Sequence, residues 1–157
     1  MSDTEKVIFK AKLELETITP EEIQKWAIEA LEKDSSNELA LDICFLPTSE
    51  QVQTYFKQIS NKITHTNLAR NEIYQLLKKH MIKNTEGTIS EEKIYSSFQK
   101  ILGLAKYIED EELYDITNSY VDEFYFSNEG YSELNPNEVL LKFINELTRL
   151  SLKSYRT

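Results

Sequence analysis

The chain of 157 residues is poor in the two residues that most often interrupt regular structure, with three glycines and three prolines. All-β folds use more of both in their turns, so their scarcity favours a helical fold. The glycines, at positions 87, 103 and 130, are also too far apart to form a glycine-rich phosphate loop.

Cysteine and histidine are scarce as well, with one and two copies. A single cysteine, Cys44, cannot form an internal disulfide, which favours a reducing, cytoplasmic location. Because Cys44 lies between Ile43 and Phe45, we expect a buried, inert thiol. Neither His65 nor His80 has a Glu, His or Cys at metal-ligand spacing, so we expect no metal and no cofactor.

Long apolar runs are missing too. The longest, "ICFL", is far shorter than the ~20 residues that a membrane span needs. The N-terminal "MSDTEKVIFKAKLE" is charged and has no apolar core of a secretory signal. We therefore expect no membrane association.

Basic residues are absent from one long stretch. Residues 107–138 hold ten acids and no Lys or Arg, whereas residues 1–106 hold 16 acids and 14 bases, and the whole chain has a net charge of -9. Almost all the excess negative charge therefore lies in one fifth of the chain. Direct binding of DNA or RNA is not expected, because phosphate contacts need a basic surface.

What the sequence does contain is a series of helix start signals. A Thr or Asn followed three residues later by Glu or Gln begins at Thr19, Thr48, Thr88 and Asn135. Apolar residues follow each signal at helical spacing, and further helices are expected after "SSNE", over residues 67–82 and over residues 111–125. The expected core residues are Trp26, Phe56, Phe98, Phe143 and Leu147.

Two segments lack a clear helical pattern. Residues 7–15 alternate like a strand but also fit a helix, which is favoured because a lone strand has no partner. Residues 126–135 contain Gly130 and are expected to form a loop. The prediction is an all-α protein: one domain over residues 1–157, a compact bundle of six to eight short helices with a strand or helix at residues 7–15.

The acidic stretch can be placed on a helix that advances ~100° per residue. Leu113, Ile116, Tyr120 and Phe124 then share one face, which should be buried. The carboxylates of the opposite face are flanked by tyrosines. The expected partner-binding residues are Glu111, Tyr114, Asp115, Asp122, Tyr125 and Glu129.

Carboxylate pairs such as Glu111 and Asp115 would need burial to act in acid–base catalysis. Their charged surroundings argue against burial, so no catalytic residue is assigned and an enzyme is not expected. A solvated acidic face above core aromatics would need no function at all, because such faces are common. The functional interpretation is that like charge beside tyrosines forms a surface for a basic protein.

This combination of properties resembles that of small acidic helical immunity proteins, which bind and block bacterial toxins. The resemblance implies an inhibitor of a basic, nuclease-like toxin domain. The alternative is a helical adaptor or regulatory protein that self-associates or binds protein partners without inhibiting a toxin.

Overall fold

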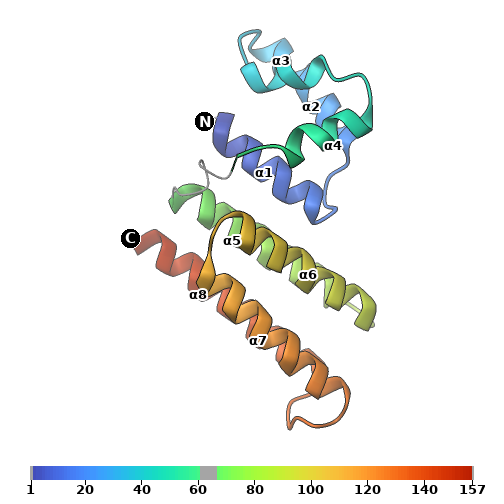
Figure 1. Cartoon of the computed structure of the whole chain (residues 1–157), viewed down its shortest axis with the longest axis vertical. Helices are drawn as coiled ribbons and strands as arrows, with labels where there is room; N and C mark the ends of the chain where they lie inside the picture. Colours follow the sequence, from blue (N-terminus) through green and yellow to red (C-terminus); the bar gives the residue numbers. More distant parts are fainter. Residues whose placement is uncertain (1, 61–66, 157) are drawn as a thin grey trace. The chain divides into compact units, whose positions relative to one another are not determined.

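The computed structural model describes residues 2–60 and 67–156 (Figure 1). Within these ranges it has eight α-helices and no strand, which confirms the all-α prediction. The helices are α1 (Ser2–Glu14), α2 (Pro20–Lys33), α3 (Glu38–Cys44), α4 (Ser49–Lys57), α5 (Asn67–Asn84), α6 (Glu91–Tyr107), α7 (Glu111–Asn128) and α8 (Pro136–Arg156).

The ambiguous segment at residues 7–15 is helical up to Glu14 and belongs to α1. Val7, Ala11 and Leu15 are buried, and their four-residue spacing is that of a helix face. The alternation of apolar and charged residues therefore does not mark a strand here.

Local capping rules place most helix starts. The Thr19 hydroxyl accepts a hydrogen bond from the Glu22 amide (3.1 Å), and the Glu22 carboxylate accepts one from the Thr19 amide (3.1 Å). Thr48 and Asn135 cap α4 and α8 as expected. The signal at Thr88 is wrong by two residues, because Ser90 is the residue whose hydroxyl accepts from the backbone of the first turn of α6.

The chain divides into two units, residues 1–65 and 66–157, and each is described by itself. The expectation of one domain over the whole chain stays a prediction. Unit 1 holds α1 to α4 around a core that includes Ile23, Leu39 and Phe56. Trp26 is only half-buried, at the edge of this core, where its ring meets that of Phe9 at 4.8 Å.

Unit 2 holds the four longer helices, which lie side by side (Figure 1). Helix α8 packs against α5 and α7, and α6 packs against α7. Phe98 sits at the centre, with its ring 6.0 Å from Phe124 and 5.3 Å from Phe143, and Leu147 is fully buried. The expected core residues of this unit are thus confirmed.

A buried polar group joins α5 to α8 within this apolar core. The Ser151 hydroxyl donates to Asn71 Oδ1 (2.5 Å) and accepts from Gln75 Nε2 (2.6 Å). Buried polar atoms need partners, so this network favours one register between the two helices.

Candidate functional site

The acidic stretch folds as α7, and its first turn is fixed by Asp110. The Asp110 carboxylate accepts a hydrogen bond from the Leu113 amide (3.0 Å), as an N-cap residue does. Glu111 and Glu112 follow in the first turn, where negative charge is favoured by the helix dipole. The acidic residues Asp110, Glu111 and Glu112 therefore stabilise the N-terminus of α7.

The buried face of α7 differs in part from the expected one. Leu113 and Phe124 are fully buried as predicted. Ile116 and Tyr120 are only half-buried, although Tyr120 packs against Phe143 at 5.4 Å. Thr117 takes the central position instead, because its hydroxyl is satisfied by the Leu113 carbonyl (2.7 Å).

The opposite face of α7 carries a row of exposed carboxylates that we name the acidic row: Glu111, Asp115, Asp122 and Glu129. Their positions fall within about 40° on the helical wheel and extend over about 27 Å. Among the described residues, none of the four forms an ion pair. The row therefore presents its full negative charge to solvent.

The bases of α8 neutralise another side of α7. Glu112 is held by Lys153 Nζ (3.0 Å) and Arg149 Nη1 (3.3 Å). The hydrogen bond from Lys153, aided by Arg149, lowers the pKa of Glu112. Sequence reasoning missed this pairing, because the residues are about forty positions apart.

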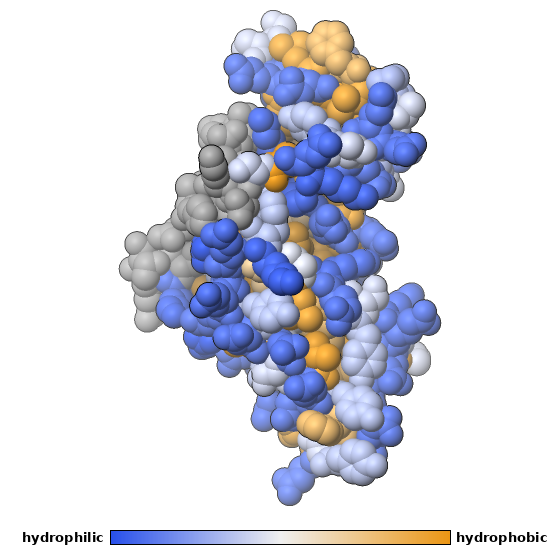
Figure 2. Space-filling model, in the orientation of Figure 1, coloured by the Kyte–Doolittle hydropathy of each residue, from blue (hydrophilic) through white to orange (hydrophobic). Residues whose placement is uncertain are grey.

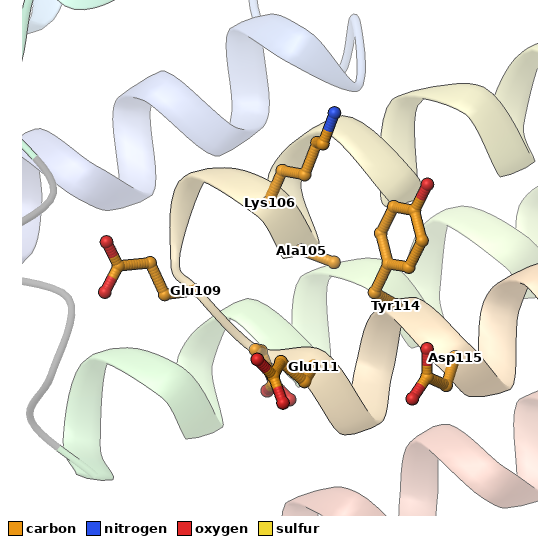
Figure 3. Close-up of a pocket in the computed structure, with 7 residues that line it drawn as sticks. Ala105, Lys106, Glu109, Glu111, Tyr114 and Asp115 are labelled. Carbon is orange, nitrogen blue, oxygen red and sulfur yellow. The ribbon is translucent and has the colours of Figure 1, made fainter.

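A pocket of about 620 Å³ opens between the end of α6 and the start of α7 (Figure 3). Tyr114 is half-buried in its wall, and its ring rises on the same side as the Lys106 side chain. The carboxylates of Glu111 and Asp115 point to the other side (Figure 3). The pocket therefore joins one expected tyrosine to two residues of the acidic row.

A buried polar cluster holds the turn beneath this pocket. Asp110 is only 5% exposed, and it accepts a short hydrogen bond from the Tyr74 hydroxyl of α5. Arg70 Nη1 lies 3.6 Å from the same carboxylate, and Arg70 Nη2 donates to the Ile108 carbonyl (3.2 Å). Burial, followed by the hydrogen bond to Asp110, raises the pKa of Tyr74. Nothing in the local sequence around Asp110 points to these partners on α5.

All six expected partner-binding residues thus lie on α7 or directly after it. Tyr114 faces the pocket beside α6, and Tyr125 is 49% exposed near the other end of the helix. The two tyrosines are three turns apart on α7, on the same side of the acidic row, and of that row only Asp115 and Asp122 lie between them along the helix. The expected residues are Glu111, Tyr114, Asp115, Asp122, Tyr125 and Glu129.

Among the residues considered for other chemistry, Cys44 has different surroundings from those expected. Cys44 is exposed, not buried, because α3 ends there and the adjacent Phe45 is 81% exposed. His80 is buried, with Nε2 2.9 Å from the Ser97 hydroxyl, while His65 lies outside the described residues. In the described ranges, no three His, Cys, Asp or Glu side chains are grouped to hold a metal ion.

None of the described helices is both long enough and apolar enough to cross a membrane. Comparisons with protein-family models, with curated proteins and with solved structures find no match for this chain.

Proposed function

We propose that this protein is a protein-binding inhibitor, an immunity protein that neutralises a cognate bacterial toxin with a basic, nuclease-like surface. The observation that carries the proposal is the acidic row, which is exposed along α7 and, among the residues that the structure describes, forms no ion pair. Such self-repulsion lowers stability, and a basic partner would relieve it.

The positions of two bases of α8 support this interpretation. Arg149 and Lys153 pair with Glu112, on the side of α7 that faces α8. The negative charge of α7 is thus neutralised on the side that faces α8, and the acidic row on the outer side keeps its negative charge. A nuclease cleft is basic because its substrate is a polyanion, so it matches the outer side.

The proposed division of labour follows from the range of each interaction. The carboxylates of the acidic row steer encounter, because their field extends about 10 Å at ordinary salt. Tyr114 and Tyr125 act at contact, where desolvated tyrosines are frequent hot spots. The protein would block its target by occupancy and would catalyse no reaction.

The test begins with isolation of the partner by co-purification, followed by association kinetics. Replacing Asp115→Lys and Asp122→Lys should slow association and weaken its dependence on salt. The matched control is Glu29→Lys with Glu32→Lys, two exposed acids on α2 whose reversal changes the net charge equally. Equal effects of the two pairs would refute a specific role for the acidic row.

Truncation of the exposed tyrosine separates binding from folding. Tyr125→Ala should mainly speed dissociation of the complex and leave the fold intact. If Tyr125 is a hot spot, the variant should weaken the free energy of binding by about 2 kcal/mol. Tyr120→Ala, which removes a contact with Phe143, should instead lower stability without any partner. Unchanged dissociation of the Tyr125 variant would contradict its assignment to the interface.

Self-association as an adaptor is the second candidate, and one observation favours it. Leu141 and Leu152 of α8 are 58% and 57% exposed, and their spacing places them on one side of the helix. Sedimentation of the protein alone decides between the two. A concentration-dependent dimer abolished by Leu141→Lys would favour the adaptor, and a monomer would favour the inhibitor.

A further inference from the structure

Three exposed aromatic side chains gather where α7 ends, and we name them the aromatic platform: Tyr125, Phe126 and Tyr131. Their exposed fractions are 49%, 46% and 78%. Two of them, Phe126 and Tyr131, lie outside the six residues of the expected binding site. The segment was expected to be a loop from residue 126, but α7 continues to Asn128.

The helix end itself builds this platform. Gly130 has a φ of 78°, and the Tyr131 amide donates to the Phe126 carbonyl (2.8 Å) while the Gly130 amide donates to the Ser127 carbonyl (3.2 Å). These two bonds form a Schellman motif, which turns the chain back over the last turn of the helix. The backbone of Tyr131 is therefore fixed next to that of Phe126.

A further bond fixes the chain that follows. The Ser127 hydroxyl, which is part-buried, donates to the Leu134 carbonyl (2.8 Å). The loop is thus tied to α7 at both ends of the platform. The platform is formed before any partner arrives, which reduces the entropy lost on binding.

Two of the three rings meet each other, and all three side chains remain exposed. The rings of Tyr125 and Phe126 are 5.8 Å apart at an angle of 65°. The space-filling view shows pale and orange side chains among blue ones over the end of α7 (Figure 2). In the same unit Phe98 and Phe124 are fully buried, so the exposure at the helix end is not general.

The sequence around the platform carries charge of one sign. Asp122, Glu123, Glu129 and Glu133 are exposed close to it in the sequence, and residues 107–138 contain no Lys or Arg. An acidic or purely apolar occupant would leave these carboxylates repelled or desolvated. The occupant must therefore combine positive charge with a surface that packs on aromatic rings.

Arginine meets both requirements better than lysine does. Its guanidinium is planar, less strongly hydrated than an ammonium group, and stacks on aromatic faces while it donates to carboxylates. We propose that the aromatic platform docks an arginine-bearing basic segment of the partner. This inference rests on the proposed function and adds the kind of side chain that the partner presents.

The test uses two synthetic Gly/Ser peptides that differ only in carrying arginine or lysine at the same positions. Each is titrated into the full chain and followed by NMR of the aromatic carbons. The arginine peptide should bind more tightly than the lysine peptide, by no more than roughly fivefold, because lysine also makes cation–π contacts and a whole exposed contact is worth only about that factor. The largest shifts should fall on Tyr125, Phe126 and Tyr131.

Variants identify the source of the preference. Phe126→Ala with Tyr131→Ala should abolish it and leave the weak, salt-dependent binding common to both peptides. Phe126→Leu, which keeps apolar surface without a π face, should reduce it. The control Phe45→Ala removes a still more exposed ring in unit 1 and should leave the preference for the arginine peptide unchanged.

Equal affinity of the two peptides for the parent protein would overturn the inference, as would a preference that survives the double variant. The peptide assay is independent of any toxin. If no toxin partner exists but the arginine preference depends on the platform, the proposed function fails and this inference stands. If Asp115→Lys with Asp122→Lys weakens the binding of a toxin partner but Phe126→Ala with Tyr131→Ala does not, the proposed function stands and this inference fails.

Discussion

Asp110 gives the sharpest prediction, because one carboxylate joins the start of α7 to two residues of α5. Asp110→Ala removes the N-cap of the helix, and loss of a cap costs about 1 kcal/mol. It also leaves the Tyr74 hydroxyl without its acceptor and Arg70 without its nearby charge. Leaving buried groups unsatisfied costs about 1–3 kcal/mol, so the total expected loss of stability is about 2–4 kcal/mol.

The assay is urea unfolding followed by far-ultraviolet circular dichroism and, in parallel, by fluorescence. Trp26, the one tryptophan of the chain, lies in unit 1, so its fluorescence reports that unit, whereas circular dichroism reports all helices. If the chain unfolds as one domain, both midpoints should move together. If the units unfold separately, only the circular dichroism signal should move.

Asp115→Ala is the matched control, because it removes an exposed carboxylate from the same helix. Surface changes of this kind usually alter stability by less than about 0.5 kcal/mol. A loss below about 1 kcal/mol for Asp110→Ala, or equal losses for both variants, would refute the view that the buried cluster holds the site in place.

Three more predictions concern other parts of the fold. Phe98→Ala should destabilise unit 2 by about 3–5 kcal/mol in thermal or urea unfolding, since its ring packs between two others, and a parent-like melting curve would contradict the core assignment. Gly103→Ala should stabilise α6 by about 0.5–1 kcal/mol, because an added Cβ meets no atom within 4 Å, and a destabilised variant would show that the glycine is needed. Burial and a hydrogen bond to Asp42 raise the pKa of Tyr55 to about 12, above that of an unfolded tyrosine. This contribution to stability is fully present below about pH 10 and is lost as the pH rises towards 12, so Tyr55→Phe should flatten the loss of stability over that range, and identical pH profiles would be the contrary result.

The sequence by itself determined the helices. Capping boxes such as that at Thr19 are local, since the bonding groups lie within one turn of each other. The error at Thr88 shows the limit of this reasoning, because Ser90 caps α6 although Lys93, not Glu or Gln, stands three residues after it, and only the observed backbone bond identifies it as the cap. The acidic row could also be predicted from the sequence, because its residues lie on one helix or directly after it and the helical wheel relates their positions directly.

Tertiary structure alone decided which elements cover each helix and which distant side chains meet there. Residues far apart in the sequence meet at Asp110 and at Glu112, and no periodicity relates α5 or α8 to the start of α7. The same holds for Cys44, whose apolar neighbours suggested burial that the fold does not provide. Helix formation depends on neighbours within about four residues, whereas burial and charge pairing depend on packing between helices, which one-dimensional patterns do not record.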